Sequence, residues 1–144
     1  MTAIKFRAWD KRRKSMEIVD RLTFMFETKD GILTEVLDLE PPVREEPRRV
    51  LFPEDCELMQ FTGLIDKNGK EIYEGDVVAY NVPVQADEDG NIDWEGVHMR
   101  IEWDAEKARF QTPFSDAENL PGQHGPKNMV VVGNIYENPE LFNL

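Results

Sequence analysis

Few side chains in this sequence have the types and spacing that catalysis requires. The 144 residues include one cysteine, Cys56, two histidines, His98 and His124, and two serines. The sequence contains no Gly-x-Ser-x-Gly, His-Glu-x-x-His or Cys-x-x-Cys motif and no glycine-rich phosphate-binding loop. Asp55 and Glu57 flank Cys56, and their negative charges would raise the pKa of the thiol and suppress the reactive thiolate. We therefore predict a protein that is not an enzyme, with no catalytic residue and no cofactor.

The sequence comes closest to a metal site in the acidic segment 85–96. Aligned on the calcium loop of an EF-hand, this segment places Asp87 and Asp89 at loop positions 3 and 5. Position 1 is Gln85 where an EF-hand has Asp, and position 12 is Gly96 where it has the bidentate Glu. We therefore predict an exposed acidic loop with a glycine turn and no bound metal. Weak binding of a divalent cation is the alternative.

Acidic residues are concentrated in the second part of the sequence. The chain carries 17 Lys and Arg against 29 Asp and Glu, a net charge of −12, of which −10 falls on residues 58–144 and −2 on residues 1–57. Much of such a surface would repel the phosphates of nucleic acid, which is therefore an unfavourable ligand. We predict instead an unidentified protein partner, for which a basic surface would be complementary. The alternative is that the carboxylates only keep the protein soluble.

The segment between residues 87 and 95 is the predicted partner-binding site. It contains five carboxylates and no basic residue, and its tryptophan is an aromatic anchor of the kind that contributes strongly to protein interfaces. The predicted contact residues are Asp87, Glu88, Asp89, Asp93, Trp94 and Glu95.

The one run of basic residues in the sequence is Lys11, Arg12, Arg13 and Lys14. A solvated turn is the simplest interpretation of so short a run. The alternative function that it suggests is a nucleic-acid-associated factor, which would contact phosphates through Lys11 to Lys14 while the acidic part of the chain points away.

Short segments with alternating or β-branched residues predict strands. In residues 4–9 a period of two places Ile4, Phe6 and Ala8 on one face and Lys5, Arg7 and Trp9 on the other, which is typical of a half-buried strand. Residues 22–26 and 32–37 flank an Asp-Gly turn signal and predict a hairpin. Further strands are predicted at residues 77–80, 97–103, 109–112 and 129–132, a polar stretch without strands at 84–96, and one helical turn from Asn138-Pro139.

Prolines separate two parts of the chain. Four of them fall within residues 41–53, and proline neither donates to a sheet nor fits inside a helix. We predict an N-terminal β-hairpin unit over 1–40, a Pro-rich linker over 41–57, and a small SH3-like barrel or roll over 58–144 that ends in a short helical turn. The first unit is too small to be stable alone, so we expect it to dock on the second. The predicted fold class is mainly β, α+β at most.

Three segments, in consistent order along the chain, carry a family resemblance: IKFRAWD at residues 4–10, LMQFTGLIDKNGKEIYEGDVV at 58–78, and VGNIYENPEL at 132–141. Together they resemble the YopX family of small bacteriophage and prophage proteins. The resemblance implies a mainly β protein with a small SH3-like barrel in its C-terminal part, and it leaves a homo-oligomer open. It implies no activity and no site residues. We interpret the matched segments as structural, with a binding surface around Tyr73 and Tyr136 as the alternative.

The predicted location is the cytoplasm of the bacterial host that the resemblance implies. No window approaches 18 uninterrupted apolar residues, and the first residues lack the apolar core of a signal peptide. A single cysteine cannot form an intramolecular disulfide, which agrees with a reducing compartment. We expect no membrane contact.

Overall fold

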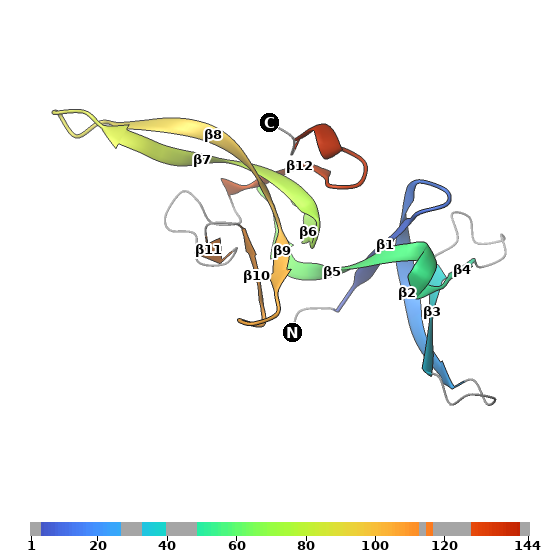
Figure 1. The fold of residues 1–144 in the computed structure, drawn as a ribbon. Helices are drawn as coiled ribbons and strands as arrows, with labels where there is room; N and C mark the ends of the chain where they lie inside the picture. The colour runs from blue at the N-terminus through green and yellow to red at the C-terminus, as the bar shows by residue number, and fades with distance from the viewer. Residues whose placement is uncertain (1–3, 27–32, 40–48, 113–114, 117–127, 142–144) are drawn as a thin grey trace. The chain divides into compact units, whose positions relative to one another are not determined.

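The computed structural model describes residues 4–26, 33–39, 49–112, 115–116 and 128–141. Within these ranges nearly every regular element is a strand and the strands pair antiparallel, so the prediction of a mainly β protein is confirmed. The elements, drawn in Figure 1, are β1 (Phe6–Asp10), β2 (Ser15–Phe26), β3 (Leu33–Leu39), β4 (Val50–Leu51), the 3-10 turn η1 (Pro53–Asp55), β5 (Cys56–Ile65), β6 (Glu71–Tyr73), β7 (Asp76–Ala86), β8 (Ile92–Arg100), β9 (Glu102–Asp104), β10 (Arg109–Thr112), β11 (Ser115–Asp116), β12 (Val130–Asn134) and the 3-10 turn η4 (Pro139–Leu141).

The chain divides into two compact units, Ala3–Gln60 and Phe61–Leu144, and the division falls inside strand β5. In the first unit the strands lie in the order β4-β3-β2-β1-β5, with β5 contributing its N-terminal half. The antiparallel pairing of β2 with β3 confirms the predicted hairpin, whose turn residues 27–32 lie outside the described residues. Its buried apolar cluster consists of Ala8, Leu39, Leu51 and Cys56, with Val19, Leu22 and Leu58 packed against it.

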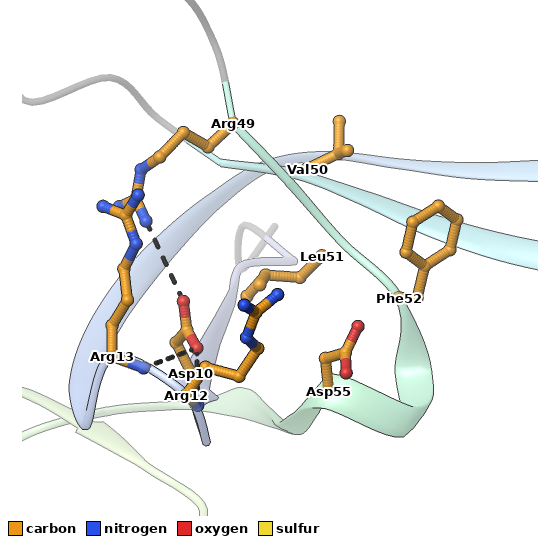
Figure 2. A pocket seen from close by; sticks show the side chains of 8 residues that line it. All are labelled: Asp10, Arg12, Arg13, Arg49, Val50, Leu51, Phe52 and Asp55. Atoms are coloured by element: carbon orange, nitrogen blue, oxygen red, sulfur yellow. Dashed lines mark hydrogen bonds and ion pairs between the residues drawn. The ribbon is translucent and has the colours of Figure 1, made fainter.

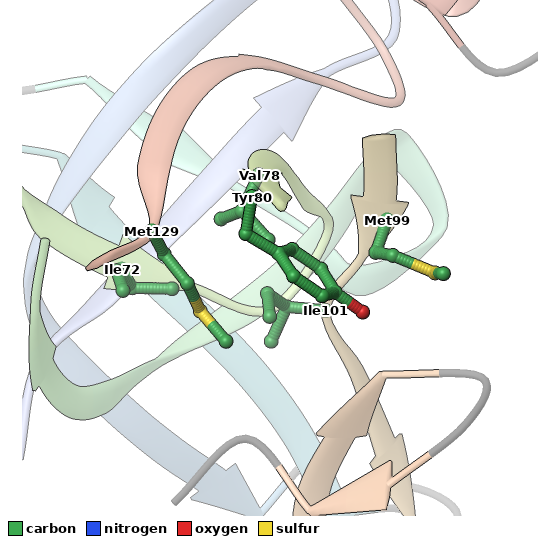
Figure 3. Close-up of a cluster of buried hydrophobic side chains, with 6 residues drawn as sticks. All are labelled: Ile72, Val78, Tyr80, Met99, Ile101 and Met129. Atoms are coloured by element: carbon green, nitrogen blue, oxygen red, sulfur yellow. The ribbon is translucent and has the colours of Figure 1, made fainter. Parts of the chain in front are cut away.

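The second unit contains the C-terminal half of β5 paired with β6, a sheet in the order β12-β7-β8, and a sheet in the order β11-β10-β9. Its core, shown in Figure 3, brings together side chains from β6, β7 and β8 and from positions next to strands. The buried members are Ile72, Val78, Tyr80, Met99, Ile101 and Met129. Strands β6, β7 and β8 of the second unit therefore share one apolar core, while the closure of this unit into an SH3-like barrel stays a prediction.

The segment expected as a linker over residues 41–57 contains regular structure where it is described. Residues 40–48 lie outside the described residues, but Val50 and Leu51 form β4 and pair with β3, and Cys56 begins β5 opposite Asp10. Pro53 opens η1, where the missing N–H of proline costs no hydrogen bond. The described end of the expected linker therefore belongs to the sheet of the first unit.

The polar stretch predicted over residues 84–96 is wrong as a description of secondary structure. Strand β7 continues to Ala86 and strand β8 begins at Ile92, so only five residues form the turn between them. The polar composition does not indicate these strands, because the side chains on both faces of the ribbon are exposed from residue 84 to residue 96. A ribbon without a buried face needs no apolar side of its own.

The strand predicted at 97–103 is interrupted at Ile101, between β8 and β9. Ile101 still bonds to the start of β7: its N–H donates to the backbone carbonyl of Asp76 at 2.9 Å, and its carbonyl accepts the N–H of Gly75 at 2.8 Å. Near the end of the chain, η4 begins at Pro139. Within the described ranges, no helix is long and apolar enough to cross a bilayer.

Candidate functional site

The buried polar side chains of the described residues hold tight turns. They are Asp10, Asp66, Asp76 and Asn134, each at most 6% exposed, and each accepts hydrogen bonds from backbone N–H groups a few residues along the chain. All four belong to the three segments that carry the family resemblance. These segments therefore contain the buried turn caps of the described residues, which agrees with the structural role expected of them.

Asp66 is the cap that reaches furthest in sequence. Its Oδ1 accepts the N–H groups of Asn68 and Lys70, both at 2.8 Å, and its Oδ2 accepts the N–H of Val131 in β12 at 2.9 Å. Burial raises the pKa of Asp66, but the hydrogen bonds from Val131, Lys70 and Asn68 outweigh it, and the pKa is lowered overall. The ionised carboxylate thus fastens the β5–β6 turn to β12.

The acidic segment contains the same turn built a second time. Asp87 Oδ1 accepts the N–H groups of Asp89 and Asn91, at 3.0 and 2.8 Å, and Asn91 Nδ2 donates to Asp87 Oδ2 at 2.8 Å. The glycine of each turn has the same left-handed φ, +83° at Gly69 and +85° at Gly90. Hydrogen bonds from Asn91 lower the pKa of Asp87. The Asp-x-Asp-Gly spacing that resembles a calcium loop therefore forms a hairpin turn.

We expect chelation to leave the melting temperature of the protein unchanged. The carboxylate at the third calcium-loop position, Asp87, is already used by its own turn, and no group of three or more His, Cys, Asp or Glu side chains in the described part of the chain is placed to hold a metal. Thermal unfolding with and without EDTA, and with added Ca²⁺, measures this. A change of several degrees in either direction would contradict it.

The six predicted contact residues all lie at one end of the β7–β8 hairpin, which Figure 1 shows as a long two-stranded arm. Strand β12 pairs with β7 only from Asp76 to Ala79. Beyond that point, residues 80–97 form a ribbon of two strands among the described residues; we call it the distal hairpin. Among the described residues, no third strand accompanies the distal hairpin, whereas β12 stabilises the proximal part of the same sheet.

The two faces of β8 in the distal hairpin differ in chemistry. Successive side chains of a strand point to opposite faces, so Ile92 and Trp94 share one face while Asp93 and Glu95 share the other. The apolar side chains are well exposed, Ile92 at 47% and Trp94 at 41%. On β7, Val84 occupies a bulge and is 57% exposed. The distal hairpin thus presents apolar and acidic side chains together.

A second candidate site is a pocket of about 550 Å³ in the first unit, shown in Figure 2. It lies between the β1–β2 turn, which contains the basic run, and the segment from Arg49 to Asp55. Its lining residues are Asp10, Arg12, Arg13, Arg49, Val50, Leu51, Phe52 and Asp55. The sequence alone did not indicate this pocket, because its two walls are separated by more than 35 residues.

The thiol of Cys56 is buried and its pKa is raised. Its Sγ lies 3.5 Å from the carbonyl oxygen of Phe52. Burial is the largest cause that raises the pKa of Cys56, and the charge of Glu57 is the next. The raised pKa predicted from the flanking carboxylates is thus confirmed, with burial as the larger cause. His98 is exposed on β8 opposite Ala79, and His124 lies outside the described residues.

Tyr73 and Tyr136, the alternative binding surface, are both half-buried. The ring of Tyr73 lies 5.5 Å from that of Phe61, and its hydroxyl donates to Glu71 Oε2 at 3.1 Å. The backbone N–H of Tyr136 donates to Asn134 Oδ1 at 3.0 Å. These contacts support the structural interpretation of the segments to which both tyrosines belong.

The fold and the sites define a mainly β protein of two units, with capped turns, an acidic hairpin arm and an arginine-lined pocket. The sequence profile of the YopX protein family matches residues 5–143, so the chain belongs to this family, as the resemblance predicted. Among solved structures, the chain is similar to the crystal structure of protein EF1440 from Enterococcus faecalis. The two share 27% sequence identity over 99% of this chain and 100% of that chain, with a TM-score of 0.59. No curated protein sequence is significantly similar to the chain.

Proposed function

We propose that the protein is a non-enzymatic protein-binding module whose contact surface is the distal hairpin. The observation that carries this proposal is the exposure of every side chain described between residues 84 and 96, including those of Ile92 and Trp94. An isolated two-stranded hairpin is at best marginally stable in water. A partner that covers the apolar face would stabilise the distal hairpin and bury its tryptophan, the residue type that most often dominates interface energy.

Charge complementarity favours a partner with a basic surface. Residues 84–97 of the distal hairpin contain five carboxylates and no basic residue. Opposite charges steer association over the Debye length of about 8–10 Å at physiological ionic strength. The partner would therefore be recruited by the acidic face and retained by the apolar one.

The proposed setting is the cytoplasm of a bacterium that carries the phage or prophage. The YopX family membership and the unpaired, buried Cys56 support this setting. In this proposal the protein acts there as a phage accessory factor that modifies the behaviour of its partner by binding it.

The test is the removal of charge from the distal hairpin. A partner captured from a bacterial lysate is measured by surface plasmon resonance against the wild type and against a variant carrying Asp87→Asn, Glu88→Gln, Asp89→Asn, Asp93→Asn and Glu95→Gln. We expect association about tenfold slower at low salt and most of the salt dependence lost. The turn should persist, because Asn keeps an acceptor oxygen where Asp87 Oδ1 accepts its backbone bonds.

A matched control separates local charge from net charge. Five exposed carboxylates outside the distal hairpin are neutralised in the same way: Asp20, Glu54, Glu106, Glu137 and Glu140. This control should keep the wild-type rate and salt slope within about twofold, whereas Trp94→Ala should mainly speed dissociation. If the distal-hairpin variant binds the partner at the wild-type rate with the same salt slope, the proposal is wrong.

A further inference from the structure

We propose that the pocket in the first unit binds a small molecule that carries a phosphate group and a hydrogen-bond donor, of the size of a nucleoside monophosphate. The proposal is independent of the distal hairpin and of any protein partner. It rests on a difference among the charged side chains that line the pocket: some have partners within the fold, and others have none among the described residues. Its volume of about 550 Å³ falls within the range of roughly 300–1,000 Å³ typical of small-molecule sites.

Two of the charged side chains that line the pocket, Asp10 and Arg49, already make hydrogen bonds or ion pairs within the fold. Asp10 is 3% exposed; its Oδ1 accepts the N–H groups of Arg12 and Arg13, at 2.9 and 3.0 Å, and its Oδ2 lies 3.8 Å from Arg49. Arg49 also donates to Glu17 Oε1 at 2.6 Å. These contacts, some of them drawn in Figure 2, occupy the Asp10 carboxylate and fix the Arg49 guanidinium on the wall of the pocket.

The guanidinium groups of Arg12 and Arg13 make no ion pair within the described part of the chain, although both line the pocket. In Figure 2 the Arg13 side chain extends toward that of Arg49 from the opposite wall. A guanidinium presents its N–H donors in a planar arrangement that matches the oxygens of a phosphate. The guanidinium groups of Arg12 and Arg13, next to the fixed guanidinium of Arg49, therefore favour a doubly charged anion. The pocket therefore has unused capacity for a phosphate.

The remaining lining residues define the rest of the ligand. Asp55 has no hydrogen-bond or ion-pair partner for its carboxylate among the described residues and can accept from an amino or hydroxyl group. Leu51 and Phe52 add apolar surface, with Phe52 41% exposed and available to a flat ring. A nucleoside monophosphate combines these features, namely a phosphate, a flat ring and hydrogen-bond donors on base and sugar.

The pocket is preorganised by backbone bonds on both walls. In the β1–β2 turn, the N–H of Lys14 donates to the carbonyl of Asp10 at 2.8 Å. The N–H of Lys11 donates to the carbonyl of Asp55 at 3.0 Å, and Lys11 Nζ lies 3.2 Å from Glu57, so the turn is tied to η1 and β5. A site fixed before binding loses less conformational entropy when the ligand enters.

The test is isothermal titration calorimetry on the full chain at low salt, with four nucleoside monophosphates (AMP, GMP, CMP and UMP), inorganic phosphate, adenosine and an oligoglutamate peptide as probes. We expect at least one nucleotide to bind with one-to-one stoichiometry. Inorganic phosphate should bind at least about tenfold more weakly, and adenosine should bind more weakly still, because each lacks part of the complementary chemistry. Amide chemical shifts of Arg12, Arg13 and Phe52 should move during the titration.

The decisive variant is Arg12→Gln with Arg13→Gln, compared with the matched control Lys67→Gln with Lys107→Gln in the second unit. Loss of both available guanidinium groups should weaken nucleotide binding at least about a hundredfold, with the fold checked by circular dichroism. The control removes the same charge from exposed side chains outside the pocket and should change binding less than about twofold.

Three results would overturn the proposal: no nucleotide binding by the wild type at millimolar concentration, an equal loss of binding in the pocket variant and the control, or binding of the oligoglutamate peptide in place of every nucleotide. Tight binding of inorganic phosphate alone would overturn the part assigned to Asp55 and Phe52.

Discussion

Replacing Asp66 with alanine is expected to lower the free energy of unfolding by about 3 kcal/mol or more. The variant loses three hydrogen bonds to an ionised carboxylate that is 5% exposed, and it leaves the N–H groups of the turn and of Val131 without their acceptor. Urea unfolding followed by circular dichroism measures the loss. The expected result is a lower midpoint with an unchanged m-value.

The chain supplies a matched control for this substitution in Asp87→Ala. Asp87 accepts the same two backbone bonds in the same turn, but it is exposed and bonds to no other strand of the described ranges. We expect this variant to lose about 1 kcal/mol or less, because water replaces the missing acceptor. Equal losses for the two variants would show that the bond from Asp66 to β12 contributes nothing to stability.

The stabilisation from Asp66 should also depend on pH. Because its pKa is lowered in the folded protein, the carboxylate contributes fully above the pKa of an unfolded aspartate, about 3.9, and the contribution is lost as the pH falls through the lowered folded value. The difference in stability between the wild type and Asp66→Ala should therefore be constant above about pH 5 and shrink in more acidic solution. A difference that grows on acidification would contradict the lowered pKa.

The second large effect is expected for Gly75→Val, which should leave little soluble protein. Gly75 has a φ of +82°, is buried, donates to the carbonyl of Ile101 at 2.8 Å and accepts from Ile135 at 3.0 Å. A β-branched side chain at this position meets both a disfavoured backbone conformation and a filled interior. Soluble yield and melting temperature of the purified variant measure the effect.

Gly90→Val isolates the backbone contribution, because Gly90 has a nearly identical φ of +85° and, apart from its own two chain neighbours, no described atom within 4 Å of where a Cβ would lie. This variant should fold and lose about 1–2 kcal/mol from its backbone conformation alone. The melting temperature should then fall by only a few degrees per kcal/mol. Similar yields and melting temperatures for the two variants would remove the structural role assigned to Gly75.

The sequence predicted those parts of the fold that depend on local signals. The Asp-Gly dipeptide marked the β2–β3 hairpin, and Asn138-Pro139 marked the position of η4, because turn and helix starts depend on neighbouring residues. The sequence does not predict the distal hairpin, because a polar composition by itself favours a loop. The repeat of the Asp-x-Asn/Asp-Gly spacing at Asp66 and Asp87 was a signal that could have revealed it as a turn between strands.

The candidate sites could be predicted only in part, because the sequence reveals local signals and not the pairing of distant strands. The six contact residues of the distal hairpin are contiguous enough for their shared exposure and charge to be anticipated. The pocket depends on the pairing of β3 with β4 and of β1 with β5, which brings Arg49 within 3.8 Å of Asp10. Such pairings depend on long-range register, and neither Arg12 nor Arg49 carries a local sign of it.

The division of the chain inside β5 has a practical consequence for dissecting the protein. Domain borders are conventionally cut at exposed, proline-rich segments, which here would separate residues 1–40 from the rest. A fragment of that kind would lack β4 and the residues from Cys56 to Gln60 that pair with β1, so β1 would become an open sheet edge prone to aggregation. Fragments of the first unit should therefore extend to the end of β5 at Ile65, and fragments of the second should begin no later than Phe61.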